Sequence, residues 1–385
     1  MPRSHIPTTH VGSLPRGTEL TAMLLARASG QSVDHIALQR EADAAVRQVI
    51  AAQIAAGVDI INDGEQSRPG FSTYITDRMN GFGGVSKRRS ASDFAKYPGF
   101  AKHWAWVFRG IPMHANTAPQ AIGPIEYHGE AQARAECERL LGHLRGNDTL
   151  QGFMTAPSPG IIATTMQNAH YDSHERYVFA LARELRKEYE TIANAGLLLQ
   201  IDAPDLGMER NVLFQDNSDR EFLDVVAMHI AALNEALIDI PRERVRLHCC
   251  WGAMERPHCD DIALESILPI IRNARVGALS LPFSNARHQH EIDVLRKLPL
   301  PPEMKLIPGV IDNTTNFIEH PQVVANRILE AVAAMGGDAD RVIAGVDCGF
   351  ATFAGFERVA GDVAFAKLKS CREGADLASA QLGNS

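Results

Sequence analysis

The sequence predicts an α/β fold, namely a (β/α)8 TIM barrel with a segment inserted after the second strand. Eight short apolar runs, rich in β-branched residues, each end in polar residues, as the strands of such a barrel do. Helix-like stretches separate many of these runs, and strands that alternate with helices indicate a parallel sheet. A length of 385 residues suits one barrel with an insertion. We therefore expect a single domain over residues 1–385.

The predicted strands follow one another in a regular series. They cover residues 8–13, 58–65, 152–158, 197–204, 245–251, 278–284, 305–312 and 342–348. Between them, apolar residues recur three and four positions apart, as on one face of a helix. The clearest helical patterns cover residues 38–56, 173–195, 219–238 and 321–335. Their lengths suit the outer ring of a barrel.

One stretch, at about 83–148, is too long for an ordinary connection between a strand and a helix. It is rich in aromatic residues and then contains Gly123-Pro124. The aromatic residues are Phe94, Tyr97, Phe100, Trp104, Trp106 and Phe108. We interpret the stretch as an insertion above the barrel mouth with at least one hairpin. A further strand-helix unit, which would make the count nine, remains open.

Composition limits the classes of partner. Hydrophobic residues make up 45% and charged residues 22%, which is typical of a globular protein with a large core. The formal net charge is -8, and no basic tract is longer than residues 87–89, so nucleic-acid and membrane partners are disfavoured. No apolar segment has the length of a membrane span, and the N-terminal residues lack the apolar core of a secretion signal. We expect a cytoplasmic protein whose six cysteines form no disulfide framework, and the oligomeric state stays open.

Polar residues follow nearly every predicted strand. In a barrel the active site lies at the carboxyl ends of the strands, so these residues receive the functional interpretation first. They are Ser13, Glu65, Ser158, Asp202, His248, Cys250, Asn285, Asp312, Asp347 and Cys348. Among them, Asp312 and Asp347 are the predicted catalytic carboxylates.

The sharpest local pattern is His248-Cys249-Cys250-Trp251. Side chains alternate along a strand, so His248 and Cys250 are expected on one face. An imidazole beside a thiolate suits zinc, and Cys348 ends the last predicted strand at the same rim. A buried structural cysteine beside a hydrogen-bonded histidine is the commoner explanation of such a pair, but Cys348 moves the balance toward a metal.

Two other groups contain ligand-type residues. His258-Cys259-Asp260 follows Gly252 and Pro257 in loop-like sequence, so we expect a solvated loop there. His288 and His290 lie in a charged stretch. Surface roles, or roles behind the metal ligands, fit them better than ligation.

Six motifs, in this order, carry a resemblance to a known family. They are TTHVGSLP at 8–15, DGEQSRPGF at 63–71, QIDAP at 200–204, HCCWG at 248–252, IPGVID at 307–312 and GVDCG at 345–349. They resemble the motifs of the cobalamin-independent methionine synthase family, specifically its catalytic C-terminal barrel and its single-domain relatives. The similarity covers nearly the whole chain.

The resemblance implies a metal centre and an amino-acid site. In that family a zinc ion, held by a His-x-Cys pair, a glutamate and a distant cysteine, activates the thiol of homocysteine for methylation. His248, Cys250 and Cys348 match three of the ligand positions. Ser13, Glu65 and Asp202 match the residues that hold the amine and carboxylate of homocysteine. Two carboxylates facing an ammonium group are also what electrostatics requires of an amino-acid site.

The chain departs from the family pattern in three places. Pro282 stands in the run where the glutamate ligand is expected, and His288 is the substitute ligand to examine. The histidine that assists methyl transfer from folate would fall near Thr314, where there is none. The sequence also shows no counterpart of the N-terminal half with which the full-length enzymes hold a polyglutamylated folate. We therefore expect a methyl donor more reactive than methyltetrahydrofolate.

The expected activity is zinc-dependent alkyl transfer to a thiol, with homocysteine as the first choice of acceptor and the identity of the donor open. One rival resembles the epoxyalkane:coenzyme M transferases, whose sulfonate substrate would need Arg16, Arg68 or Arg287. A second rival is a metal-free lyase of the uroporphyrinogen decarboxylase type. A third is a barrel retained only for binding.

Overall fold

Seven parallel strands form the central sheet of the computed structural model, which describes residues 5–107, 118–147, 149–252 and 254–383. The strand order is β1-β4-β5-β6-β7-β8-β9. The strands are β1 (Ile60–Ile61), β4 (Gln151–Pro157), β5 (Leu198–Asp202), β6 (Val245–His248), β7 (Ala278–Pro282), β8 (Lys305–Ile311) and β9 (Gly345–Val346). Each described strand of this sheet falls inside or within one residue of a predicted run.

The sheet closes through the first predicted run. Thr8 bridges Ala344 and Thr9 bridges Ile60, both in parallel register, so residues 8–9 lie between the two edge strands. The Thr9 amide donates to the Ala344 carbonyl at 2.8 Å, and the Ile60 amide donates to the Thr8 carbonyl at 3.0 Å. The fold is therefore an α/β barrel, as predicted, with its first strand reduced to two bridged residues.

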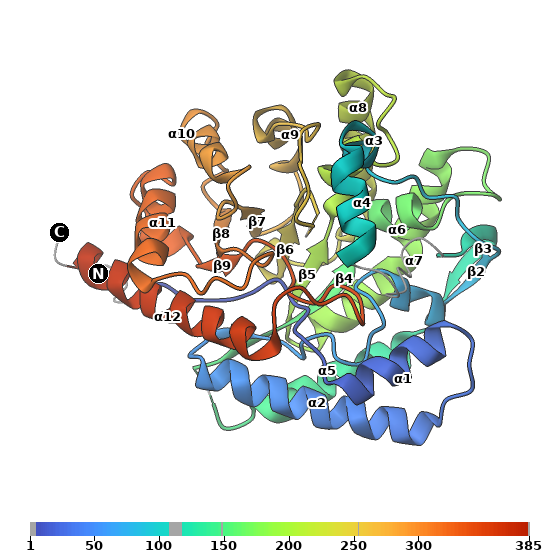
Figure 1. Cartoon of the computed structure of the whole chain (residues 1–385), viewed down its shortest axis with the longest axis horizontal. Helices are drawn as coiled ribbons and strands as arrows, with labels where there is room; N and C mark the ends of the chain where they lie inside the picture. The colour runs from blue at the N-terminus through green and yellow to red at the C-terminus, as the bar shows by residue number, and fades with distance from the viewer. Residues whose placement is uncertain (1–4, 108–117, 148, 253, 384–385) are drawn as a thin grey trace.

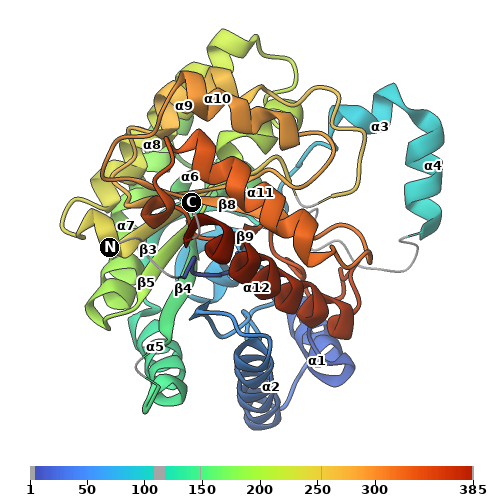
Figure 2. The ribbon, with the colours of Figure 1, turned by 90° about the vertical axis from the view of Figure 1, so that its left-hand side faces the viewer.

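Helices surround the sheet (Figures 1 and 2). They are α1 (Thr18–Ala28), α2 (His35–Ala55), α5 (Glu130–Leu144), α6 (Pro159–Thr165), α7 (His174–Asn194), α8 (Asp219–Ala236), α9 (Leu264–Ile271), α10 (Val294–Lys297), α11 (Pro321–Ala334) and α12 (Gly361–Gly383). Short 3-10 helices cover Thr73–Asp77, Pro204–Leu206, Met208–Asn211, Arg242–Arg244, Gln289–Asp293 and Ala339–Arg341. In the part of the chain that is described, no helix has both the length and the apolar character needed to cross a membrane.

Local sequence explains where the long helices begin. The Ser173 hydroxyl accepts from the Arg176 amide at the start of α7. At the start of α8, Ser218 and Glu221 form a reciprocal capping box, which satisfies two amides that a helix leaves free. The inner faces of these helices then pack on the sheet and form one large apolar core.

The stretch predicted as an insertion, at about 83–148, contains one strand, two short helices and the outer-ring helix α5, and the strand pairs with a segment that ends at Gly83 and not within a hairpin. β2 (Met79–Gly83) pairs antiparallel with β3 (Gln120–Tyr127) in a separate two-stranded sheet, so neither is a ninth barrel strand. α3 (Ser92–Lys96) and α4 (Pro98–Val107) stand beside the barrel mouth, apart from the outer ring (Figure 2). Phe108 lies outside the described residues. The exact domain limits, with an insertion at about 83–148, stay a prediction.

A buried ion network connects α5 and α7 to the segment after β1. Glu136 pairs with Arg68 at 3.1 Å and with Arg78 at 2.6 Å, and Arg78 also pairs with Glu188 at 3.1 Å. All four side chains are buried. Burial opposes the charge of Glu136, but the two guanidinium groups hold its pKa at about 2, below the usual 4.5. Glu136 is therefore ionised at neutral pH.

Replacing Glu136 by glutamine should lower the free energy of unfolding by roughly 3–5 kcal/mol, because two buried arginines lose their shared counter-charge. Urea unfolding measures this loss. Glu138→Gln, on the exposed side of the same helix, is the matched control and should stay within about 0.5 kcal/mol of the wild type. A Glu136→Gln variant as stable as this control would contradict the account.

The wild type and the Glu136→Gln variant can also be compared as the pH is lowered. A depressed carboxyl pKa stabilises the folded state above the unfolded value and loses that effect as the pH falls through the folded value. The difference in unfolding free energy between wild type and Glu136→Gln should be complete above pH 4.5 and shrink toward pH 2.

Candidate metal centre and substrate cavity

A cavity of about 410 Å³ opens at the carboxyl ends of the barrel strands. Its inner wall brings together most of the residues singled out in the sequence. They are Ser13, Glu65, Asp202, His248, Cys250 and Cys348. Its outer wall comes from the insertion and from the loop after β9. The barrel therefore places the predicted metal ligands and the predicted amino-acid site in one chamber.

His248, Cys250 and Cys348 form a cluster that can hold a metal ion. Their ligand atoms lie within 4.8 Å of one another, and all three side chains are buried. The two Sγ atoms are 3.9 Å apart although 98 residues separate them in the chain. His248 Nδ1 lies 3.3 Å from the Ser280 hydroxyl, whereas its Nε2 is buried without a hydrogen-bond partner. A buried unpartnered imidazole nitrogen is costly, and a bound cation would satisfy it.

The pKa values of the two thiols are shifted in opposite directions. Hydrogen bonding from Cys348, aided by His248, lowers the pKa of Cys250 well below its usual value. The same contact, together with burial, raises the pKa of Cys348. The contact and the neighbouring His248 thus favour the thiolate form at Cys250 over that at Cys348.

Strand alternation explains this cluster only in part. β6 ends at His248, so Cys250 lies beyond the strand and not on one of its faces as expected. Cys348 likewise follows the end of β9 by two residues. The ligands are thus carried by the first turns of two loops, which the closed sheet holds at the same rim.

Glu65 is held in a strained position with one oxygen free. Its φ of 54° lies in the left-handed region, which a residue with a side chain rarely adopts. Oε1 accepts from the Thr155 hydroxyl at 2.8 Å, while Oε2 is buried without a hydrogen-bond partner. Gly12, at φ 139°, makes room, since a Cβ there would come within 2.8 Å of Glu65 Oε1. Such a carboxylate is prepared for a cationic partner.

Asp202 ends β5 on the same cavity. Its Oδ1 accepts from the Gln200 side chain at 2.8 Å. Burial and, to a smaller extent, the charge of Glu65 raise its pKa to about 8, against the opposing effects of His248 and of the Gln200 hydrogen bond. Ser13 lies close to Gly349, where a Cβ would come within 2.1 Å of the serine hydroxyl oxygen. Two carboxyl groups that repel each other's charge favour a ligand with a positive charge.

A buried polar group formed by Arg246, Gln200 and Thr9 lies beneath these residues and was not predicted. Arg246 donates from Nε to Gln200 at 2.6 Å and from a terminal nitrogen to the Thr9 hydroxyl at 2.9 Å. Its guanidinium lies 3.9 Å from the ring centroid of Phe153. Gln200 precedes Asp202 by two positions, and Arg246 precedes His248 by two. The period of a strand was therefore the signal that could have identified both.

The two predicted catalytic aspartates lie in different surroundings. Asp347 uses both oxygens on the loop after β7, accepting from the amides of Phe283, Ser284 and Asn285 at 2.9–3.0 Å. Asp312 accepts from the amide and hydroxyl of Thr314 and faces a neighbouring cavity of about 470 Å³. Asp347 therefore holds this loop in place, and its catalytic role stays a prediction. The role of Asp312 stays a prediction.

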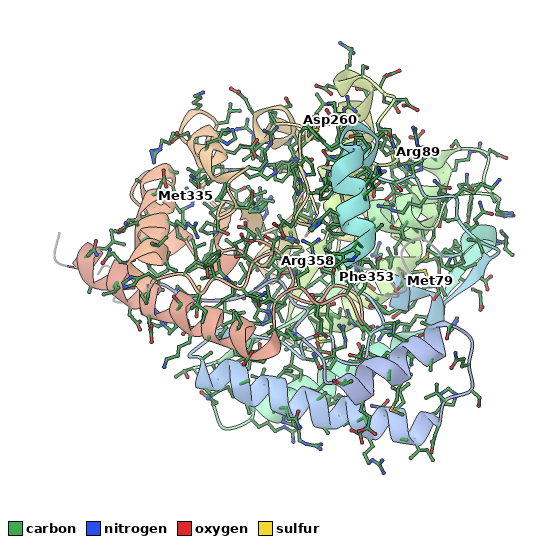
Figure 3. The ribbon with its side chains drawn as sticks, in the orientation of Figure 1. Met79, Arg89, Asp260, Met335, Phe353 and Arg358 are labelled. Atoms are coloured by element: carbon green, nitrogen blue, oxygen red, sulfur yellow. The ribbon has the colours of Figure 1, made fainter. Side chains whose placement is uncertain are left out.

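An aromatic wall covers the mouth of the cavity. It consists of Phe71, Phe94, Trp104, Phe353 and Phe356. Phe71 and Phe353 meet edge to face at 5.6 Å, and Phe94 and Trp104 at 5.9 Å. Phe353 and Arg358 lie near one end of α4, and Asp260 lies near the other (Figure 3). The insertion thus contributes apolar surface to the cavity, in line with its aromatic composition.

Comparison with known families identifies this arrangement. The model of the cobalamin-independent synthase catalytic domain matches residues 6–93 and 114–376. The chain belongs to that family. It is therefore an enzyme of the methyltransferase class, as the sequence motifs predicted.

Curated relatives of this family member align over most of its length. A methionine synthase of Sulfurisphaera tokodaii is 25% identical over 324 residues, which is 83% of this chain and 79% of the relative. A methionine synthase of Saccharolobus islandicus is 24% identical over 378 residues, covering 98% and 96%. A B12-independent methionine synthase from a Shewanella species, solved with selenomethionine, has a TM-score of 0.73 at 22% identity, covering 99% and 100%. This likeness confirms the barrel fold.

Pro282, which stands in the run where the resemblance leads us to expect the family's glutamate ligand, ends β7 and cannot ligate a metal through its side chain. His288, the substitute that we considered, is not part of the cluster. Its ring nitrogens contact Glu291 and Asp261 instead. Among the described residues, no carboxylate joins His248, Cys250 and Cys348 within 4.8 Å. Three protein ligands with an open position are typical of a catalytic metal site.

The expected solvated loop at residues 258–260 is also different in the structure. His258 Nδ1 lies 2.6 Å from Asp261 Oδ2, and only 12% of its side chain is exposed. The Cys259 thiol donates to Asp93 in α3 at 2.9 Å. This segment is an ordered contact between the insertion and the barrel loops, because charged partners from both sides meet there.

Cys250→Ala and Cys348→Ala should each lose one bound metal ion per chain, since each change removes one of three ligands. Cys259→Ala is the matched control and should keep the wild-type metal content, because that thiol bonds to Asp93. Elemental analysis after desalting measures the content. Unchanged metal in both cluster variants, or a loss confined to the control, would refute the assignment.

Proposed function

We propose that this chain is a zinc-dependent S-methyltransferase that methylates the thiol of homocysteine. The observation that carries the proposal is a pair of buried, unpartnered atoms on one cavity, namely His248 Nε2 and Glu65 Oε2. The first calls for a metal ion and the second for an ammonium group. A thiol that also carries an amine supplies a metal ligand and a cation in one small molecule.

Zinc fits the donor set better than a hard cation does. One imidazole and two thiolates are ligands that zinc prefers, whereas magnesium and calcium require oxygen. Zinc, when bound there, keeps a coordinated substrate thiol deprotonated at neutral pH. The Ser280 hydroxyl lies close enough to His248 Nδ1 to fix the orientation of the ring, as a hydrogen-bond partner behind a metal ligand commonly does.

The chain's own residues would orient the acceptor. Glu65 and Asp202 bind the substrate ammonium, and the Ser13 hydroxyl binds its carboxylate. Thr155 and Gln200 hold the two carboxylates in place. The aromatic wall would lie beside the sulfur and offer apolar surface along which the carbon that is transferred approaches. Positioning of this kind turns an encounter of two molecules into a reaction within one complex.

The rival with a sulfonate substrate is less well supported. Arg16 donates to the carbonyls of Ala351 and Glu65, and Arg68 is committed to Thr155 and Glu136. Arg287 is exposed and lines the neighbouring cavity. None of these three presents a free guanidinium beside the cluster. The match to the synthase family and the buried thiols likewise favour a transferase over a metal-free lyase or a binding-only barrel.

Other findings support the choice of homocysteine. The curated relatives are named methionine synthases, and the Shewanella protein was solved with selenomethionine, the selenium analogue of a methylated homocysteine. The acceptor is therefore a homocysteine-like thiol and the second substrate a methyl donor.

Glu65→Gln or Asp202→Asn should weaken homocysteine binding by roughly 1–3 kcal/mol, the contribution of a charged hydrogen bond, while the metal stays bound. Calorimetry on the zinc-loaded protein measures the affinity. The control ligand is 2-mercaptoethanesulfonate, which has no amine and should bind wild type and variants alike. Tighter binding of this sulfonate than of homocysteine to the wild type would support the rival transferase.

The proline at position 282 predicts that only a reactive methyl donor supports fast methyl transfer. The chain has one anionic ligand fewer than the family pattern, so the substrate sulfur is held by a less negative set of groups and is a weaker nucleophile. Purified protein should form methionine slowly, or not at all, from methyltetrahydrofolate and homocysteine. Pro282→Glu should increase this rate, and Pro282→Ala is the matched control without a new ligand. Rapid turnover by the wild type would show that the donor argument is mistaken.

A further inference from the structure

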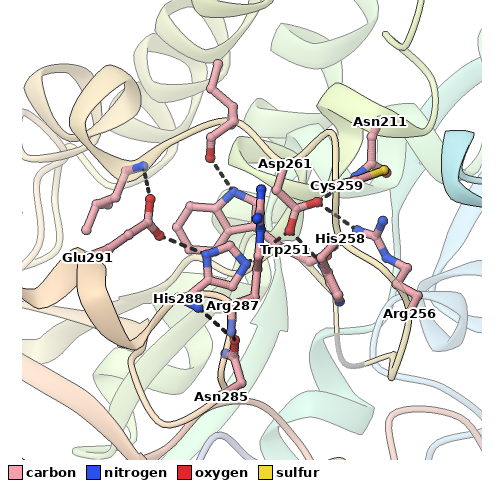
Figure 4. Close-up of polar contacts among 12 residues, drawn as sticks. Asn211, Trp251, Arg256, His258, Cys259, Asp261, Asn285, Arg287, His288 and Glu291 are labelled. Atoms are coloured by element: carbon pink, nitrogen blue, oxygen red, sulfur yellow. Dashed lines mark hydrogen bonds and ion pairs between the residues drawn. The ribbon is translucent and has the colours of Figure 1, made fainter.

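A second cluster of ligand-type side chains lies between the loops that follow β6 and β7 (Figure 4). His258 Nδ1 is 2.6 Å and His288 Nε2 is 3.0 Å from the same atom, Asp261 Oδ2. The three ligand atoms lie within 4.8 Å of one another. The side chains of Asp261 and His288 are buried, with 1% and 6% of their surface exposed. This cluster is distinct from the one formed by His248, Cys250 and Cys348.

The outward-facing nitrogens of both rings contact groups that only accept hydrogen bonds. His288 Nδ1 lies 2.8 Å from the Glu291 carboxylate, and His258 Nε2 lies 2.8 Å from the Met254 carbonyl. Each outward nitrogen must therefore carry the ring's proton. A neutral ring then directs a bare lone pair at Asp261 Oδ2, which also carries lone pairs. Either a second proton on each ring or a metal ion must therefore lie between the rings and Asp261 Oδ2, and hydrogen bonds to Asp261 and Glu291 raise the pKa of His288 to about 9 against the effect of burial.

The remaining contacts show the pattern that surrounds metal ligands. A histidine that binds a metal commonly donates its other N–H to a carboxylate or a backbone carbonyl. Here Glu291 and the Met254 carbonyl have these two roles. The other oxygen of Asp261 accepts from Asn211 at 2.6 Å and from Arg256 at 3.1 Å, which leaves Oδ2 for the cluster.

The local charge balance also calls for two positive charges. Asp261, Glu291 and Asp93 face one guanidinium, that of Arg256, which pairs with Asp93 and Asp261. This leaves two negative charges in excess before the imidazoles are considered. One divalent ion, or one extra proton on each ring, would neutralise them.

We propose that His258 Nδ1, Asp261 Oδ2 and His288 Nε2 bind a divalent transition-metal ion. Two imidazoles and one carboxylate are a donor set that suits zinc, cobalt(II) or iron(II). Access is available, since cavities of about 470 and 510 Å³ border His258 and Asp261. His258 also has a φ of 54°, and strain of this kind is found at ligand sites.

The ion would connect two loops at the barrel mouth. His258 and Asp261 belong to the loop after β6, and His288 to the loop after β7. The ring of Trp251 stacks on His288 with centroids 4.4 Å apart, and Trp251 directly follows Cys250. The second ion therefore has a structural role, in which it holds the segment that carries Cys250.

Metal stoichiometry with cobalt(II) tests the proposal. After the full chain has been stripped with a chelator and loaded with cobalt(II), the wild type should retain two ions. His258→Asn and Asp261→Asn should retain one each, because the affinity of the second site for cobalt(II) falls about 100-fold or more. Asparagine tolerates the backbone of residue 258. The exposed neighbour His290→Asn is the matched control and should retain two. Cys348→Ala should also retain one ion, the one at the second cluster. It should lose the absorption of cobalt–thiolate bonds, which His258→Asn should keep.

Two results would overturn the proposal. One is a wild-type chain that retains a single ion, lost in Cys348→Ala, which would mean that protons occupy the second cluster. The other is a folded His258→Asn variant that still retains two ions. The number of ions retained by the wild type tests the proposal by itself, so the test does not depend on whether Asp261→Asn folds.

Discussion

Closure of the parallel sheet by two residues is the constraint on which the rest of this structure depends. Thr8 and Thr9 bridge the edge strands β9 and β1, and only a closed sheet brings the ends of β6 and β9 to a common rim. The Cys250 and Cys348 sulfurs meet there at 3.9 Å. The same closure lets Arg246 reach Thr9 beneath the site. Barrel geometry therefore brings Cys348 to the local pair of His248 and Cys250.

The site is built from groups that lack partners in the protein alone. Glu65 and His248 each keep one buried polar atom unsatisfied, and burial raises the pKa of Asp202 to about 8. Burial without compensation destabilises a fold, so such groups persist where a ligand completes them. The ion network around Glu136 and Arg78 lies beside this region and fixes Arg68, which in turn holds Thr155 next to Glu65. The ion network and the predicted substrate site are thus connected through one buried chain of contacts.

Sequence patterns predicted what depends on strand order and missed what depends on side-chain contacts between distant segments. The eight runs, the mouth-facing residues and the barrel were predictable, because residue types at strand ends repeat along the chain. The shortness of the first strand was not predictable, because two bridged residues are enough to close the sheet when β1 and β9 lie on either side of them. His258 was interpreted as a loop residue, because nothing local shows that His288, thirty positions later, meets the same carboxylate. Gln200 and Arg246 were missed although the period of two pointed to them.

The central claim is that a substrate thiol completes the cluster of His248, Cys250 and Cys348. Absorption of the cobalt(II)-loaded protein in the thiolate charge-transfer region tests it most directly, because this signal follows the number of sulfur ligands and is insensitive to a site built from nitrogen and oxygen. Adding homocysteine should raise the signal by about half, as two thiolates become three. A spectrum unchanged by saturating homocysteine would contradict the account.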